Sequence, residues 1–377
     1  MKKLFQEICF LAFGLLFLSA SAFAQKRNDS IVFDAGEEGV HTYRIPSIVM
    51  TKSGVLLAFA EARHDGAGDT GDIDIVVKRS SDGGRTWAKQ ALVWDDGSNV
   101  CGNPCPVLVR ENGRVLLLST WNDGRDSESD ILGGKGHDTR RVFCLYSDDD
   151  GLTWSEPRDI TGSVKKDWWT WYATGPCHAI QLSGGRIIVP CNHGYDGSDA
   201  KHLYASHVIY SDDAGASWHI GGSPGVGNEC TVAELADGGV MLNMRTQGAD
   251  RDTAGFGRLV AISHDLGESF GNAYYDRGLI EPVCNGSLEN WSSDGTPTRN
   301  LLFVNPESKS SRRNLTVKVS RNSGHSWDRL FTVTEGPAAY SDIIAFPDGS
   351  VGVIYECGDV GTYERISFCR VNEPSNH

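Results

Sequence analysis

A pattern of eight residues that recurs five times constrains the fold of this chain more than any other feature. It reads S-x-[DN]-x-G-x-[TS]-[WF], and its copies occupy 80–87, 147–154, 211–218, 263–270 and 320–327. Serine and aspartate side chains bond to the local backbone, glycine accepts a positive φ, and the closing aromatic ring packs into the layer beneath. Each copy therefore predicts a turn between two strands, and we expect these turns to be structural and to carry no chemistry.

Short β-type segments surround every copy. A segment of this kind precedes each one (73–77, 142–146, 207–210, 259–262 and 315–319), and helical periodicity is nearly absent. Four short strands per unit of roughly 50 to 65 residues, with one signature turn per unit, are typical of a β-propeller. Five copies plus one unit without a copy predict an all-β, six-bladed propeller, with the N-terminal strand closing the last blade.

The N-terminus has the features of a secretory signal peptide. Two lysines precede an apolar run from Ile8 to Leu18, and Ala22-Phe23-Ala24 forms an A-x-A cleavage site. We therefore expect a signal peptide at 1–24, cut after Ala24, a single domain at 25–377, and a secreted or periplasmic protein. No later run reaches the roughly 18 apolar residues that a membrane-spanning helix needs.

Charge and cysteine content exclude several classes of function. The net charge of −14 argues against nucleic acid and anionic membranes as partners. Cysteines in strand-like runs are expected to be buried thiols, while Cys101 and Cys105 are either a disulfide or two free thiols. Zinc is not expected, because no second pair with suitable spacing accompanies them. We expect no metal and no cofactor, and a monomer.

Arg44 lies in an otherwise apolar strand start, His41 to Ile48. A guanidinium keeps its charge at any physiological pH, so its burial is unfavourable unless an anion meets it. Either a carboxylate of this chain or an anionic ligand must therefore lie beside Arg44.

The repeated turns, of the kind called Asp-boxes, and the element Tyr43-Arg44-Ile45-Pro46 together resemble the exo-α-sialidase (neuraminidase) family. The resemblance extends from Tyr43 to about Glu356. It implies a glycoside hydrolase that removes terminal α-linked sialic acids from glycoproteins, glycolipids and oligosaccharides with retention of configuration. Sialylated glycans are then the expected partners.

The resemblance also implies a site for the carboxylate of the sugar. The family binds this carboxylate with three arginines, which match Arg44, Arg245 and Arg312, although the adjacent Arg313 is an alternative to Arg312. Guanidiniums that converge in this way repel one another in an empty site and bind an anion tightly. Glu356 resembles the glutamate that holds the first arginine, and Arg63 resembles an arginine that contacts ring substituents.

The catalytic groups follow from the same resemblance. Tyr340, in Ala339-Tyr-Ser-Asp342, resembles the family's tyrosine nucleophile, a known exception among glycosidases. A phenol is a weak nucleophile at its ordinary pKa near 10 and needs a base beside it. Glu229 resembles the glutamate that serves as this base in the family. Asp69, in a glycine-rich loop, falls where the acid/base aspartate of the family falls. Asp65 and Asp74 are the alternatives on the same loop.

Several positions remain open. Asp123 and the aromatic cluster 168–172 are expected at the pocket wall, where the alternative is a turn residue and ordinary core or surface aromatics. Cys177 stands where many relatives have glycine. The rival functions are a trans-sialidase, an intramolecular trans-sialidase, a hydrolase for the deaminated sugar acid, and a non-catalytic propeller that binds sialic acid.

Overall fold

A computed structural model describes residues 27–195, 204–247 and 255–372. Regular structure in these ranges is nearly all strand, as the sequence predicts. The helical elements of the described part are η1 (Glu37–Gly39), α1 (Glu128–Leu132) and α2 (Thr161–Val164). The expected signal peptide and its cut after Ala24 lie outside the described residues. None of the described helices is long and apolar enough to span a membrane.

Apart from one parallel bridge between Ile73 and Val100, the described strands pair antiparallel. They form four continuous sheets, which divide into successive groups of strands along the chain. The first group contains β2 (Thr42–Met50), β3 (Leu56–Arg63), β4 (Ile73–Ser80) and β5 (Ala91–Trp94). The second contains β6 (Val100–Leu108), β7 (Val115–Asn122), β8 (Arg141–Ser147) and β9 (Arg158–Asp159). The third contains β10 (Tyr172–Thr174), β11 (Ile180–Gln181), β12 (Ile187–Gly194), β13 (Tyr204–Ser211) and β14 (His219–Ile220).

The fourth group contains β15 (Cys230–Glu234), β16 (Val240–Met244), β17 (Gly257–Ser263) and β18 (Tyr274–Ile280). The fifth contains β19 (Ser287–Asn290), β20 (Leu301–Pro306), β21 (Arg313–Ser320) and the first half of β22 (Asp328–Ala345). The second half of β22 continues into the last group, with β23 (Val351–Cys357), β24 (Arg365–Val371) and the N-terminal β1 (Arg27–Asp34). The expected closure by the N-terminal strand is confirmed, because β1 pairs with β24.

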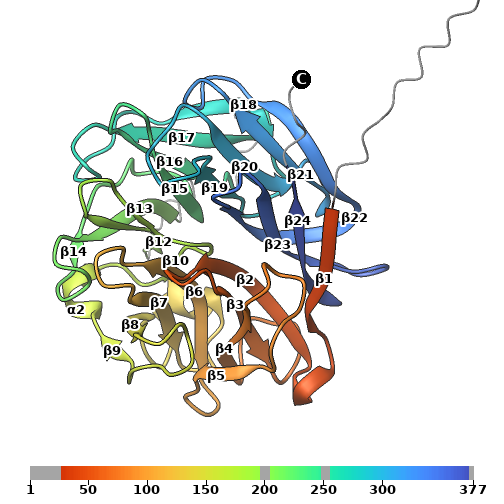
Figure 1. The fold of residues 1–377 in the computed structure, drawn as a ribbon. Coiled ribbons are helices and arrows are strands. Elements are labelled where there is room, and N and C mark those ends of the chain that lie inside the picture. Colours follow the sequence, from red (N-terminus) through yellow and green to blue (C-terminus); the bar gives the residue numbers. More distant parts are fainter. Residues whose placement is uncertain (1–26, 196–203, 248–254, 373–377) are drawn as a thin grey trace, which may run out of the picture.

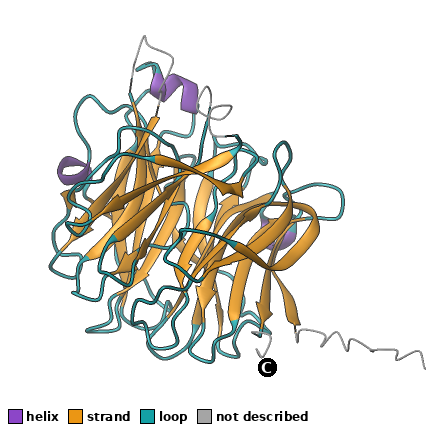
Figure 2. Cartoon of the chain, turned by 90° about the horizontal axis from the view of Figure 1, so that it is seen from above, coloured by secondary structure: helices purple, strands orange, loops and turns teal. Residues whose placement is uncertain are grey.

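The groups follow one another around a common centre (Figure 1), and Figure 2 shows their sheets side by side with loops at the strand ends. The larger hydrophobic clusters of the described residues each join two successive groups. Phe59 of β3 and Leu117 of β7 share one cluster, for example. Phe33 of β1 and Phe368 of β24 pack with Leu56 of β3, so the last group packs against the first. Apolar packing between neighbouring sheets thus closes a propeller-like ring.

The five repeats form the turns that the sequence predicts. They connect β4 to β5, β8 to β9, β13 to β14, β17 to β18 and β21 to β22. In every copy the glycine N–H donates to the serine Oγ at 2.8–2.9 Å. The seventh residue donates its N–H to the Asp or Asn Oδ1 at 2.8–3.0 Å. The five glycines have φ between 76° and 88°, the left-handed region that glycine tolerates best.

Two β-bulges near the centre of the ring interrupt the pairing of β2 and β22 and release backbone amides. In β2 the residues Ile45 and Pro46 form the bulge, and Ile45 has a φ of 56°. In β22 the pairing shifts between Ala338 and Ser341, around Tyr340. The buried carboxylate of Glu356 accepts the N–H of Ile45 at 2.9 Å and that of Tyr340 at 3.1 Å. One side chain therefore satisfies the amides that both bulges release from their ladders.

Candidate active site

A pocket of about 340 Å³ opens where β2, β6 and β15 begin and where β3, β12 and β16 end. Because neighbouring strands are antiparallel, these ends lie on the same side of the ring. Charged and polar side chains dominate its wall. It is lined by Arg44, Ile45, Glu61, Arg63, Asp69, Ile73, Val100, Asn103, Glu128, Arg140, Trp171, Ala173, Asn192, Asn228, Glu229, Arg245, Gln247, Arg312, Tyr340 and Tyr363.

Three arginines of the pocket surround Tyr340. The Cζ atoms of Arg44 and Arg312 lie 5.4 Å and 5.1 Å from the centre of its ring, and Arg245 Nη1 donates to its hydroxyl at 2.9 Å. The structure thus brings together the three arginines selected from the sequence. Arg313 is exposed, bonds to the Glu335 carbonyl and does not line the pocket, so Arg312 is the arginine at this position.

Arg44 reaches the pocket because of the bulge that follows it. Its Nε donates to Glu356 Oε1 at 3.0 Å, and its guanidinium lies 4.1 Å from the ring centre of Tyr363. Burial by itself would lower the pKa of Arg44, but Glu356, Tyr363 and Tyr340 keep this pKa above its ordinary value. Arg44 is therefore a permanent cation with its remaining donors toward the pocket.

Tyr340 and Glu229 form a short hydrogen-bonded pair. The hydroxyl of Tyr340 donates to Glu229 Oε1 at 2.5 Å, and Arg245 donates to the other carboxylate oxygen of Glu229. Burial, followed by the negative charge of Glu229, raises the pKa of Tyr340 well above its usual value. The phenol is therefore protonated in the free protein, and Glu229 stands in position to accept its proton.

Asp69 lies at the mouth of the pocket with 70% of its side chain exposed. Its Oδ1 is 2.7 Å from Arg63 Nη1 and 3.7 Å from Arg44 Nη1. Partial burial would raise the pKa of Asp69, but Arg63 and Arg44 hold it below its usual range. Asp65 and Asp74 do not line the pocket, which leaves Asp69 as the loop aspartate that faces it.

The pocket also contains residues that were not selected from the sequence. Glu61 holds Arg63, Tyr363 accepts a hydrogen bond from Arg312 at 2.7 Å, and Arg140 lies 4.1 Å from the ring centre of Trp171. Glu61 precedes Arg63 by two residues in an apolar strand, which is the same type of signal that identified Arg44. Tyr363 lies in a loop without a motif, and no sequence signal identifies it.

Asp123 is not among the lining residues. Its carboxylate instead accepts a hydrogen bond from Arg125 Nη2 at 2.5 Å. The structure therefore does not place Asp123 in the pocket wall. The aromatic residues of 168–172 lie in three different environments. Trp171 lines the pocket, Trp169 and Tyr172 are buried in the core, and Trp168 is exposed.

The described cysteines, from Cys101 to Cys369, are buried free thiols, so Cys101 and Cys105 form no disulfide. Cys177 does not line the pocket but lies beneath it, where its Sγ faces the Cys230 carbonyl at 3.8 Å. Its φ is 136°, a conformation that glycine adopts more readily than other residues. Cys177 is therefore a buried thiol outside the lining of the pocket.

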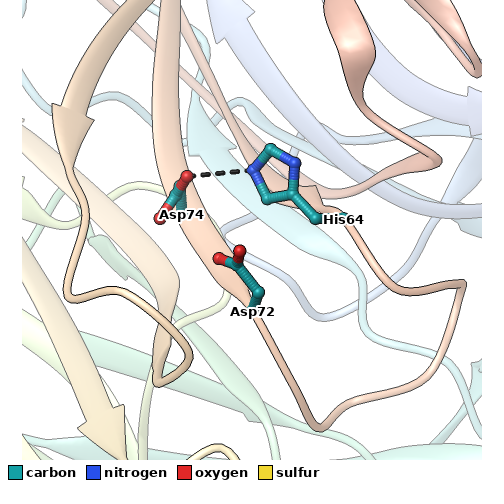
Figure 3. Close-up of side chains that lie close together, drawn as sticks. All are labelled: His64, Asp72 and Asp74. Atoms are coloured by element: carbon teal, nitrogen blue, oxygen red, sulfur yellow. Dashed lines mark hydrogen bonds and ion pairs between the residues drawn. The ribbon is translucent and has the colours of Figure 1, made fainter.

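Two groups of side chains in the described ranges could hold a metal ion. His64, Asp72 and Asp74 lie at the base of the loop that carries Asp69, with His64 Nε2 3.0 Å from Asp74 Oδ2 (Figure 3). The second group is Asp123, Asp126 and His137. Neither group lines the pocket.

Comparisons with known proteins give the family of the chain. A family model described as a BNR repeat-like domain matches residues 54–353. The chain is 33% identical over 337 residues to a sialidase of Micromonospora viridifaciens, covering 86% of this chain and 51% of that protein, about half its length. It is 33% identical over 398 residues to sialidase-3 of Mus musculus, covering 90% of this chain and 93% of that protein.

A solved structure is similar as well. The Hadza microbial sialidase Hz136 matches with a TM-score of 0.79 and 29% identity, over 91% of this chain and 68% of that chain. Extensive identity to sialidases, a matching repeat domain and a shared fold lead to one assignment. The chain belongs to the sialidase family.

Proposed function

We propose that this protein is an exo-α-sialidase that hydrolyses terminal α-linked sialic acids from glycoproteins, glycolipids and oligosaccharides with retention of configuration. One observation carries the proposal: three guanidiniums surround a tyrosine whose hydroxyl is bonded to a carboxylate. The arginines select an anion, and the tyrosine places a nucleophile beside it. Sialic acid carries its carboxylate on the anomeric carbon and so presents both groups to one site.

Arg44, Arg245 and Arg312 bind the carboxylate of the sugar. Arg44 and Arg245 already have carboxylate partners in Glu356 and Glu229, while Arg312 donates only to Tyr363 and to the Val283 carbonyl among the described residues. Each arginine thus has an orienting contact and further donors for the ligand. The position of the carboxylate fixes the anomeric carbon above Tyr340.

Tyr340 attacks the anomeric carbon through its hydroxyl oxygen while Glu229 takes the phenolic proton. A neutral phenol approaches a carbon that bears a carboxylate with less repulsion than an anionic nucleophile would experience. The raised pKa of Tyr340 makes this concerted removal of the proton necessary, because the phenolate is not populated beforehand.

Asp69 gives its proton to the glycosidic oxygen as the bond from that oxygen to the anomeric carbon breaks. In the free protein two arginines keep Asp69 ionised. Bound substrate raises the pKa of Asp69, because the substrate carboxylate offsets the charge of Arg44 and the leaving sugar covers the exposed aspartate. Asp69 then takes a proton from the water that cleaves the tyrosyl intermediate, and Glu229 returns the phenolic proton to Tyr340.

The substitution Tyr340→Phe tests the proposal. It removes one oxygen and leaves the ring between Arg44 and Arg312, so the fold should be retained while release of free sialic acid from α2,3- and α2,6-sialyllactose is lost. Release near the wild-type rate would overturn the proposal. Product analysis of the wild-type protein with added lactose separates hydrolysis from transfer, because a trans-sialidase forms new sialyllactose and an intramolecular enzyme forms an anhydro sugar.

We also propose that the strand groups form six blades, and that residues 25–377 act as a single catalytic domain of a secreted or periplasmic monomer after removal of 1–24. The pairing of β1 with β24 and the shared clusters between groups support the blade count.

A further inference from the structure

Glu61 is a buried carboxylate in the pocket wall for which the reaction above has no role. It is 3% exposed and lies near the end of β3. Its Oε2 accepts hydrogen bonds from Arg63 Nε at 3.0 Å and from Arg63 Nη2 at 2.5 Å. Its Oε1 accepts the Asn103 N–H at 2.8 Å. Glu61 is therefore held by Arg63 of its own strand and by an amide of β6.

Glu61 repeats the position of Glu356 in the next strand group. Glu356 accepts an amide from the bulge of β2, at Ile45, and holds Arg44 through Nε at 3.0 Å. Glu61 accepts an amide from a bulge of β6, where the pairing shifts between Gly102 and Cys105. It holds Arg63 through Nε at the same distance of 3.0 Å. Both glutamates thus satisfy a bulge and orient an arginine.

Arg63 in turn holds the loop that carries the proton donor. Its Nη1 donates to the carbonyls of Ala67 and Gly68 at 2.7 Å and 2.8 Å, and pairs with Asp69 Oδ1 at 2.7 Å. The backbone of a glycine-rich loop is therefore tied to a side chain that is itself 3% exposed. The position of Asp69 depends on Arg63, and the position of Arg63 depends on Glu61.

We propose that Glu61 is a positioning residue for proton transfer: it fixes Arg63, which holds the Asp69 loop at the glycosidic oxygen. This inference rests on the proposed role of Asp69 as the acid. Neutralising Glu61 releases one side of the Arg63 guanidinium, and the loop then loses its fixed position over the leaving group.

The test compares two leaving groups in the variant Glu61→Gln. An aryl sialoside with a good leaving group needs little protonation, whereas sialyllactose needs it fully. A general acid contributes roughly 10²- to 10⁴-fold, so we expect kcat/KM on sialyllactose to fall by about 100-fold and on the aryl sialoside by less than about 5-fold. Equal losses on both substrates, or no loss on either, would overturn the inference.

The matched control is Asp65→Asn, which removes a carboxylate from the same loop without touching Arg63. Asp65 accepts the Asp72 N–H at 3.2 Å and lies outside the pocket lining, so the ratio of the two substrates should stay at the wild-type value. A changed ratio of kcat/KM on the two substrates in Asp65→Asn would show that loss of any carboxylate near the loop has this effect, and would contradict a specific role of Glu61. If Glu61→Gln does not fold, Glu61→Asp keeps the charge but cannot reach Arg63 and Asn103 together, and it should change the ratio in the same direction.

A double substitution separates positioning from a general structural role. If Glu61 acts through Asp69, adding Glu61→Gln to Asp69→Ala should lower kcat/KM on sialyllactose by less than about 3-fold further. Losses that multiply would contradict the inference. A wild-type protein inactive on both sialosides would instead refute the proposed function, so the two failures are distinguishable.

Discussion

The substitution Arg44→Lys tests how the pocket recognises its anion. Lysine keeps the positive charge but replaces a planar fork by one ammonium, which cannot hold Glu356 and a ligand carboxylate in the same geometry. A hydrogen bond to a charged group contributes roughly 1.5–3 kcal/mol, so the loss of one donor should weaken binding of sialic acid about 10- to 100-fold. The fold should lose only about 1 kcal/mol, because Glu356 keeps its bonds from Ile45 and Tyr340.

Calorimetric titration with free sialic acid measures the first effect, and urea unfolding measures the second. Arg313→Lys is the matched control, since this neighbouring arginine is exposed and contacts the Glu335 carbonyl. It should change neither affinity nor stability. An affinity of Arg44→Lys within about 3-fold of wild type would refute the reasoning, as would an equal loss in the control.

Two further predictions concern stability. His193 Nδ1 and His207 Nδ1 lie 3.0 Å apart in the core, and burial lowers the pKa of His193 to about 3 and that of His207 well below its usual value. The unfolded chain therefore binds protons near pH 6.5 that the folded chain does not, and the free energy of unfolding should fall by up to about 1.4 kcal/mol per pH unit and histidine as the pH drops from 6.5 toward 3. The raised pKa values of His178 and Asp74 act in the opposite direction, so urea unfolding at pH 7.5 and 5 measures this slope as the difference between the wild type and a variant with His193→Gln and His207→Gln. The same pH dependence in both proteins would contradict it. Asp82→Ala removes the acceptor of the first repeat turn, so the melting temperature should fall while kcat/KM stays at the wild-type value; a loss of activity in a protein still folded at the assay temperature would show that the turn is not purely structural.

The repeat predicted most of the architecture because its turns are local. Ser80 and Asp82 bond to amides within a few residues, so the pattern alone specifies the turn and the strands on either side. The copies also predicted that the strand groups follow one another in chain order, because each copy marks one group. Pairing of β1 with β24 depends on contacts between the chain ends, and it was predicted from the count and not from any local signal.

The site was predicted where a charged residue interrupts an apolar strand, as at Arg44, or where a motif surrounds it, as at Tyr340. Asp123 shows the limit of this reasoning: a turn aspartate beside an aromatic run looks like a pocket residue, but a local arginine, Arg125, takes its carboxylate. Asn103 enters the pocket through a bulge, and bulges depend on pairing between strands that the local sequence does not specify.

The chemistry of Tyr340 can be tested directly by trapping the intermediate. A 2,3-difluorinated sialic acid carries a good leaving group, and its ring fluorine slows hydrolysis of the glycosyl enzyme. Incubation with the wild-type protein, digestion and mass spectrometry should place one fluorosialyl group on the peptide that contains Tyr340, and none in Tyr340→Phe. An adduct on Glu229 or Asp69, or turnover of sialosides without any adduct, would contradict the account.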